Sequence, residues 1–265
     1  MPDEPGRANP LTAKANFSLP VGGGFLHASA HLPTGQTTLT ELLPILQNLE
    51  NAIGGRIEAE AREAGSPISC KAGCGACCRQ MVPVSLFEAE ALMSWIRSLD
   101  QEHHAEIERR FDRALKGLRE AGLLDRLVKE EWASEEVRAT QLAIDYFRAH
   151  VACPFLVEES CSIHPIRPLS CREYLVTSSP DLCRDPAENE VRGVEFPIKL
   201  SNVLYQFGRE IERDPRGWIP LVFLLAWGKS GSRPGDWVAG TGEEVMRKFL
   251  EQVSAVAKRL AEQSD

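Results

Sequence analysis

The sequence predicts a mainly α-helical protein, a single helical domain around a cysteine-bound metal centre, with a small β-hairpin near the N-terminus. Three observations lead to this prediction. Apolar residues recur at helical spacing over several long stretches, serine or threonine caps precede three of them, and all eight cysteines fall into two groups. With 265 residues, of which 43% are hydrophobic and 26% charged, the chain can bury a core and does not have a disordered composition.

Residues 1–37 are expected to form a flexible arm and the hairpin. Residues 1–16 are rich in Pro, Gly, Asn and Ala, as flexible arms are. Apolar residues then alternate over Phe17–Val21, a run of three glycines follows, and the alternation resumes over Leu26–Leu32. Two alternating runs separated by a glycine turn are typical of a β-hairpin.

Helices are expected on both sides of the cysteines. Residues 38–69 form a helical lead-in, with a helix to about residue 64, and residues 184–265 form a helical C-terminal extension. Three capping-box pairs, Thr38 with Glu41, Ser85 with Glu88, and Thr241 with Glu244, mark helix starts. Further helices are expected near residues 85–99, 102–130, from Ser134 onward, 199–213, 219–228 and 242–262.

The central segment, residues 70–183, is expected to be a cysteine-cluster metal-chelating domain. One group of cysteines is compressed into nine residues, and the other is spread over a proline-rich stretch downstream. Irregular, proline-rich chain buries little surface and needs an internal staple, so the fold is expected to bring the two groups together. The first group is Cys70, Cys74, Cys77 and Cys78, and the second is Cys153, Cys161, Cys171 and Cys183.

The first group has the spacing of a metal site. Cys74 and Cys77 form a Cys-x-x-Cys pair, which chelates zinc or an iron–sulfur cluster. Gly73 and Gly75 are expected to let the backbone curl so that the thiolates converge. The second group has intervals of 8, 10 and 12 residues, unlike a zinc finger or ribbon, so its segments are expected to donate single ligands.

Cys77 and Cys78 are adjacent, so their side chains should diverge, by about 100° on a helix. They are expected to belong to different metal sites, or one of them is a buried spare. Residues three and four apart share a helix face, which favours Cys70, Cys74 and Cys77 as one set. Cys78 would then turn toward the second group.

Three other interpretations of the cysteines stay open. Disulfides need an oxidising compartment, but the first residues lack the apolar core of a signal peptide, so a reducing cytoplasm is expected. Cys183, or one of Cys77 and Cys78, is a candidate for a buried small hydrophobe. The triplet ending at Cys77 also has the spacing of radical S-adenosylmethionine enzymes, although Ala76 and the helical chain downstream argue against that class.

Several short motifs recur around the cysteines. They are the Cys70–Cys78 motif, Val84, Glu88, Cys153-Pro154-Phe155-Leu156, Cys161, Ile163, Arg167-Pro168 and Cys171-Arg172-x-Tyr174. Together they resemble the YkgJ-type cysteine-cluster (CxxCxxCC) family, whose domain is described as zinc- or iron-chelating. The resemblance covers roughly residues 70–180 and implies eight metal ligands. A relative, flagellin lysine-N-methylase, is associated with an iron–sulfur cluster, so the resemblance carries an alternative function as an iron–sulfur-associated protein lysine N-methylase, and whether the chain is an enzyme stays open.

Two arginines are the candidate cofactor-binding residues. Arg167 and Arg172 flank the third cysteine of the second group, where they can offset thiolate charge or donate hydrogen bonds to sulfur. Ion pairs with Glu173 or Glu159 are the alternative. His164 lies between two expected ligands and is either a hydrogen-bonded loop histidine or a further ligand.

Composition limits the partners. Lys and Arg number 30 and Asp and Glu 38, a net charge of −8, which argues against a nucleic-acid binder. The longest apolar run, Trp218–Trp227, is interrupted by Pro220 and is too short to cross a membrane. The expected partner is a metal ion, zinc or iron, alone or in an iron–sulfur cluster. A protein partner contacting the C-terminal helices is a further hypothesis.

Overall fold

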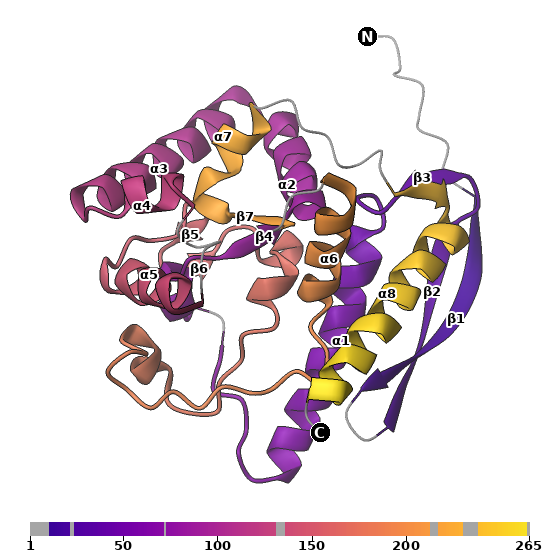
Figure 1. Cartoon of the computed structure of the whole chain (residues 1–265). Helices are drawn as coiled ribbons and strands as arrows, with labels where there is room; N and C mark the ends of the chain where they lie inside the picture. Colours follow the sequence, from indigo (N-terminus) through magenta and orange to yellow (C-terminus); the bar gives the residue numbers. More distant parts are fainter. Residues whose placement is uncertain are drawn as a thin grey trace.

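The computed structural model describes residues 11–21, 24–71, 73–130, 136–212, 217–229 and 238–263, and its fold is mainly α-helical with an N-terminal β-hairpin, as predicted (Figure 1). The first half of the described chain contains β1 (Thr12–Val21), β2 (Gly24–Pro33), β3 (Gln36–Thr38), α1 (Leu43–Glu63), the 3₁₀-helix η1 (Ala76–Arg79), β4 (Pro83–Ser85), α2 (Leu86–Ser98), α3 (Gln101–Glu120) and α4 (Leu124–Val128). The second half contains α5 (Glu136–Arg148), β5 (Leu156–Val157), β6 (Ser160–Cys161), η3 (His164–Ile166), η4 (Leu169–Cys171), η5 (Pro180–Arg184), α6 (Leu200–Glu212), β7 (Trp218–Pro220), η6 (Leu221–Phe223), α7 (Leu224–Gly228), β8 (Ala239–Thr241) and α8 (Gly242–Gln263).

The described strands pair in twos, all antiparallel: β1 with β2, β3 with β8, β4 with β7, and β5 with β6. The pairs β3–β8 and β4–β7 join segments that are far apart in the sequence, and so they hold the C-terminal third of the chain against its N-terminal third. Within the described residues, none of the helices combines the length and hydrophobicity that a membrane crossing requires.

The hairpin differs from its prediction at its start. β1 begins at Thr12, so residues 12–16, predicted to belong to a flexible arm, pair with the end of β2. The pairing continues through Phe17, which lies opposite Ala28. Ladder hydrogen bonds to a ten-residue partner outweigh the weak strand propensity of the alanines and asparagine in this stretch. The rest of the predicted arm, residues 1–10, and the turn glycines Gly22 and Gly23 lie outside the described residues.

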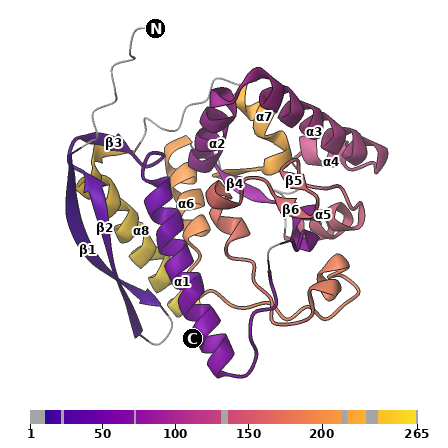
Figure 2. The same cartoon turned by 180° about the vertical axis from the view of Figure 1, so that it is seen from behind.

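The hairpin covers one side of a helix layer formed by α1, α6 and α8 (Figures 1 and 2). One hydrophobic core fills this region, and every one of these elements contributes buried side chains to it. Val245, Phe249 and Val253 of the predicted apolar stripe of α8 are buried there. The ring of Phe249 stacks on Phe207 of α6 with centroids 6.4 Å apart. We call β1, β2, α1, α6 and α8 the apolar lobe.

All three predicted capping-box pairs form their hydrogen bonds, and two of them start a helix as predicted. Ser85 Oγ accepts from the Glu88 N–H at 3.2 Å, and the Glu88 carboxylate accepts from the Ser85 N–H at 3.0 Å. The same exchange joins Thr241 with Glu244 at the start of α8. It also joins Thr38 with Glu41, but α1 begins only at Leu43 with Leu42 as its N-cap, so this pair closes the turn after β3 and does not cap the helix. These are local features, readable from side chains three residues apart.

The other side of the molecule consists of α2, α3, α4, α5 and α7 around two smaller hydrophobic cores. Phe155 and Ile163, from the segment that carries the second cysteine group, are buried in one of these cores. The edge of the Phe155 ring faces the ring of Phe111 in α3, with centroids 5.6 Å apart. The second cysteine segment is therefore anchored to this side of the fold at its N-terminal end.

Two predicted helices are shorter than expected. The helix predicted over residues 102–130 is divided into α3 and α4 at Gly122, whose φ is +71°. The helix predicted over 219–228 begins instead as strand β7, because Ile219 is β-branched and Pro220 adopts an extended conformation with no N–H to donate. Its remaining residues are helical, first as the 3₁₀-helix η6 and then as α7. The predicted start at Ser134 lies outside the described residues, and α5 is described from Glu136.

Candidate metal centre

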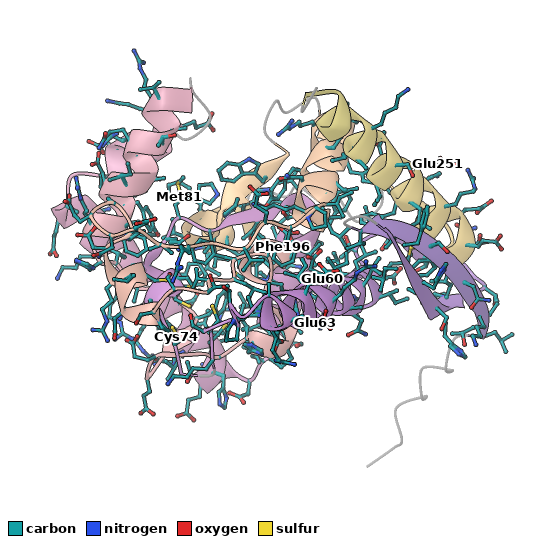
Figure 3. The ribbon with its side chains drawn as sticks, turned by 90° about the horizontal axis from the view of Figure 1, so that it is seen from below. Glu60, Glu63, Cys74, Met81, Phe196 and Glu251 are labelled. Carbon is teal, nitrogen blue, oxygen red and sulfur yellow. The ribbon has the colours of Figure 1, made fainter. Side chains whose placement is uncertain are left out.

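The cysteines lie on irregular chain that runs between the two sides of the fold. The first group occupies the loop after α1 and the short helix η1, and the second lies before β5, in β6, in η4 and in η5. Figure 3 places Cys74 on the opposite side of the molecule from Glu251 of α8. All eight cysteines are free thiols.

Two glycines shape the first cysteine loop for different reasons. Gly73 has φ +80°, which favours glycine, so here the predicted curl of the backbone is present. Gly75 has an ordinary φ of −95°, and its requirement is space. A Cβ at this position would lie 2.7 Å from Glu159 Oε2 and 2.8 Å from Leu156 Cδ1. The β5–β6 hairpin therefore packs directly on the backbone of the first cysteine loop.

Backbone contacts bring the two cysteine groups together, as predicted. The N–H of Cys153 donates to the carbonyl of Cys78 at 2.7 Å. At the other end of the loop, the N–H of Ser69 donates to the carbonyl of Val176 at 2.9 Å. The first group is thus held at both ends by the segment that carries the second group.

Electrostatic interactions show which thiols are neighbours across the two cysteine groups. Burial and, next, the thiols of Cys70 and Cys74 raise the pKa of Cys183 to about 11. Burial raises the pKa of Cys153 to about 12, with Cys161 adding to the rise. We call Cys70, Cys74 and Cys183 the Cys183 set, and Cys78, Cys153, Cys161 and Cys171 the Cys153 set. Cys77 acts on members of both sets.

Cys77 and Cys78 diverge less than the sequence predicted. Their side chains share a hydrogen bond, which lowers the pKa of Cys77 to about 7 and raises the pKa of Cys78. The tight 3₁₀ turn of η1 brings the two adjacent thiols close enough for this bond. Beyond it, Cys78 interacts with Cys153 and Cys161 of the second group, in the direction that the sequence predicted.

The comparisons with known proteins agree with this geometry. Residues 69–192 match the family model CxxCxxCC, described as "Putative zinc- or iron-chelating domain". We call residues 69–192 the CxxCxxCC domain, after the model that they match. The matched range includes all eight cysteines, Cys183 among them, whereas the apolar lobe lies largely outside it. No curated protein and no solved structure matches the chain.

The side chain of Arg172 makes its hydrogen bonds to backbone carbonyls of the CxxCxxCC domain and to α1. It is 6% exposed and donates to the carbonyls of Pro165 at 2.7 Å and Arg167 at 3.2 Å, and to Asn51 Oδ1 of α1 at 2.8 Å. The alternative ion pairs with glutamates are replaced by other contacts. The carboxylate of Glu159 pairs with Arg79, and that of Glu173 accepts hydrogen bonds from Ser201.

Arg167 is differently placed. Its Nε is buried and has no hydrogen-bond partner among the described residues. Burial raises the pKa of Cys161 and Cys171, and the positive charge of Arg167 offsets part of each rise. It acts in the same direction on Cys70, a member of the other set. One guanidinium therefore reaches thiols of both sets.

His164 lies in η3 and is exposed. Partial burial lowers the pKa of its imidazole, and the charges of Arg167 and Arg172 lower it further. A neutral imidazole could ligate a metal, but this one is solvent-facing, in keeping with a loop histidine. His27 and His31 of β2 are exposed as well, and His27 shares a hydrogen bond with Ser18 at 2.8 Å.

A buried carboxyl network behind the centre was missed from the sequence. Glu88 accepts from the N–H of Leu169 at 2.6 Å, which ties the start of α2 to the turn that carries Cys171. Burial raises the pKa of Glu173 to about 7 and that of Glu50, in α1, to about 9. Glu50 is 1% exposed, neither of its oxygens makes a well-formed hydrogen bond, and the Leu200 backbone offsets only part of the pKa rise. Its place on the apolar face of α1, four residues after Leu46, was the available signal.

The donors of the CxxCxxCC domain suit a soft metal, because thiolates bind zinc and iron. Within the described residues, however, no three His, Cys, Asp or Glu side chains are placed so that they could already hold an ion. Closing a site therefore requires rotation of thiol side chains that are already neighbours. The orphan N–H of Arg167 fits such a site, because a thiolate sulfur would satisfy it.

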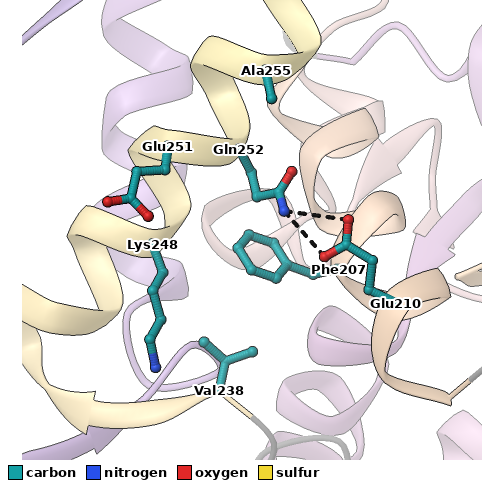
Figure 4. A pocket seen from close by; sticks show the side chains of 7 residues that line it. All are labelled: Phe207, Glu210, Val238, Lys248, Glu251, Gln252 and Ala255. Carbon is teal, nitrogen blue, oxygen red and sulfur yellow. Dashed lines mark hydrogen bonds between the residues drawn. The ribbon is translucent and has the colours of Figure 1, made fainter.

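Two cavities of the described structure lie away from the cysteines. One of about 340 Å³ is lined by residues of α6 and α8, including Phe207, Glu210 and Lys248 (Figure 4). Gln252 Nε2 donates to Glu210 across it, at 3.1 Å. A wider groove of about 650 Å³ lies between the hairpin and α8. No cysteine lines either of them.

Proposed function

We propose that the CxxCxxCC domain binds metal at two neighbouring sites, each held by four cysteines. The Cys153 set supplies one site. Cys77 joins the Cys183 set to supply the other. The observation that carries this proposal is that thiols from both ends of the domain are neighbours. The backbone N–H of Cys153 donates to the carbonyl of Cys78, whose thiol interacts with Cys153 and Cys161, while the Cys183 thiol interacts with Cys70 and Cys74.

Zinc and iron, the latter alone or in an iron–sulfur cluster, both fit an all-cysteine site. A site closed by four protein ligands is structural or, with iron, an electron carrier, because it leaves no open position for a substrate. The thiols need a reducing compartment such as the cytoplasm to persist. Four thiolates around one divalent ion leave surplus negative charge, and the guanidinium of Arg167, whose Nε is buried, offsets it.

The two arginines then have separate roles. Arg167 donates its free Nε hydrogen to a ligand sulfur and makes the surrounding thiols easier to ionise. Arg172 positions the turn before Cys171 through two backbone carbonyls and connects it to α1. An N-methylase function is not part of this proposal.

Metal analysis of single and paired cysteine variants tests the proposal. Cys171→Ser and Cys183→Ser are each expected to lose one site's metal, and the pair together both, because they belong to different sets. Ala152→Ser, which places the same side chain at an exposed position next to Cys153, is the control and is expected to retain all metal. A paired variant that loses no more metal than either single variant would show one shared site and contradict the partition.

A further inference from the structure

The turn of the β5–β6 hairpin has a costly backbone conformation. Strands β5 and β6 are connected by the two residues Glu158 and Glu159, whose φ angles are +48° and +59°. Two-residue hairpin turns with positive φ at both positions are normally built from asparagine and glycine, because a Cβ clashes with the backbone there. Here both positions carry glutamate.

The side chain of Glu159 is held by the first cysteine loop. Arg79 Nη2 donates to Glu159 Oε1 at 2.6 Å, and Arg79 Nη1 donates to Glu159 Oε2 at 3.1 Å. The same Nη1 also donates to the carbonyl of Gly75 at 2.8 Å. Arg79 thus fastens the hairpin that carries Cys161 to the loop that carries the first group.

Gly75 completes this contact. Its missing Cβ lets the Cα of Glu159 come within 3.2 Å of the position that a Cβ would occupy. Gly75, which has no Cβ, and Glu159, which has left-handed backbone, therefore both allow the two cysteine segments to lie close together.

Stability alone does not account for this arrangement. The side chains of Arg79 and Glu159 are 24% and 54% exposed, and ion pairs at such positions contribute little to folding. The left-handed conformation of Glu159 acts against folding. What the pair does provide is a fixed distance between the two segments that supply the ligands.

We propose that Arg79 and Glu159 are positioning residues for metal binding, a clamp that holds the first cysteine loop against the β5–β6 hairpin. The clamp reduces the ordering that the ligands must undergo when an ion binds, and so it raises affinity. This inference rests on the proposed function.

Glycine substitutions at the two turn residues distinguish loss of the Arg79–Glu159 ion pair from relief of the backbone strain. Both Glu158→Gly and Glu159→Gly relieve left-handed backbone, but only the second removes the partner of Arg79. In the zinc-loaded full chain, competition with a chromophoric chelator measures how tightly zinc is held. Glu158→Gly is expected to equal the wild type, and Glu159→Gly to hold zinc about 10- to 100-fold more weakly, as loss of outer contacts to ligands does.

Charge exchange supplies a second readout that a purely structural role would not move. Arg79→Glu is expected to weaken zinc binding, and Arg79→Glu combined with Glu159→Arg is expected to recover most of the loss. Equal affinity of Glu158→Gly and Glu159→Gly, or failure of the exchanged pair to recover, would overturn the clamp while zinc binding by the wild type still stands. A wild-type chain that binds neither zinc nor iron would overturn the proposed function and the clamp with it.

Discussion

The apolar lobe and the cysteine segments are stabilised by different means. In the apolar lobe, the hairpin and three helices share one continuous hydrophobic core. Between Ile57 and Val84, in contrast, no described hydrophobic residue is buried, although this stretch carries the whole first cysteine group. Polar contacts hold it instead, among them the Cys153–Cys78 backbone bond and the Arg79–Glu159 pair.

This difference indicates what metal contributes. A core of this extent can form from apolar burial alone. The first cysteine segment buries no described hydrophobic residue that would offset the entropy of ordering it, and a bound ion supplies that stability in other cysteine-rich sites. Removal of metal should therefore affect mainly the cysteine segments, and truncation of core side chains should affect mainly the apolar lobe.

Removal of metal is expected to have the largest effect and to separate the two regions most clearly. After a chelator strips the anaerobically purified protein, amide exchange in residues 73–80 should accelerate by about 100-fold or more, because metal–thiolate bonds contribute several kcal/mol to local order. Helices α1 and α8 should keep their protection. Uniform acceleration along the whole chain would show that the two regions do not differ in this way.

Truncation of a core side chain in the apolar lobe should lower the stability of the fold and leave metal binding unchanged. Phe249→Ala removes a fully buried ring and is expected to lower the free energy of unfolding by about 3–5 kcal/mol in denaturant titrations. Metal content should stay unchanged at temperatures where the variant is folded. Phe25→Ala, at a side chain 65% exposed, is the control, and its expected change is within about 0.5 kcal/mol. Loss of metal in Phe249→Ala would show that metal binding depends on the packing of the apolar lobe.

A buried carboxyl between the two regions should make stability depend on pH. The pKa of Glu50 is raised from 4.5 to about 9 by burial, so between these values the folded chain keeps a proton that the unfolded chain releases. Its contribution to stability therefore falls as pH rises from 4.5 to 9. Glu50→Gln cannot ionise and is expected to be more stable than the wild type by about 1–3 kcal/mol at pH 7.

The gap between wild type and Glu50→Gln should widen toward pH 9 and close near pH 4.5, as measured by thermal unfolding across that range. Glu63→Gln, at an exposed position in the same helix, should leave the pH dependence unchanged. A constant gap at all pH values would mean that Glu50 is ionised in the folded chain.

Loss of the Arg167 charge is expected to have the smallest effect. Burial keeps the thiols of Cys161 and Cys171 protonated, and Arg167 partly opposes this, so Arg167→Gln should raise their pKa further. Because metal displaces thiol protons, zinc binding should then move to higher pH and weaken about tenfold at pH 7. Arg167→Lys should retain most of the affinity. Identical zinc titrations of Arg167→Gln and wild type would show that Arg167 does not contribute to metal binding.

The sequence was most informative where the interactions are local. The capping boxes at Ser85 and Thr241 depend on side chains three residues apart, and the hairpin depends on alternation within two short runs. The joining of the two cysteine groups was predictable as well, because cysteine-rich, proline-rich chain needs a partner. The match to a model described as a zinc- or iron-chelating domain supports the prediction of metal chelation.

Features that depend on distant segments were missed. Residues 12–16 become strand only because the end of β2 lies beside them, and Ile219 is extended because it pairs with Val84. Arg79 and Glu159 are 80 residues apart in the sequence, and no local sequence pattern predicts that they pair. The arrangement of Glu50, Glu88 and Glu173 likewise arises only when α1, α2 and the turn after Cys171 are packed together.

The central claim is that eight cysteines form two four-thiolate metal sites. Its most direct test is zinc, iron and acid-labile sulfide analysis of the anaerobically purified wild-type chain, combined with X-ray absorption at the edge of the metal found. We predict stoichiometric metal at two sites with four sulfur ligands each, at about 2.3 Å if the metal is zinc. A folded, metal-free chain whose eight thiols all react with a thiol reagent would contradict the account.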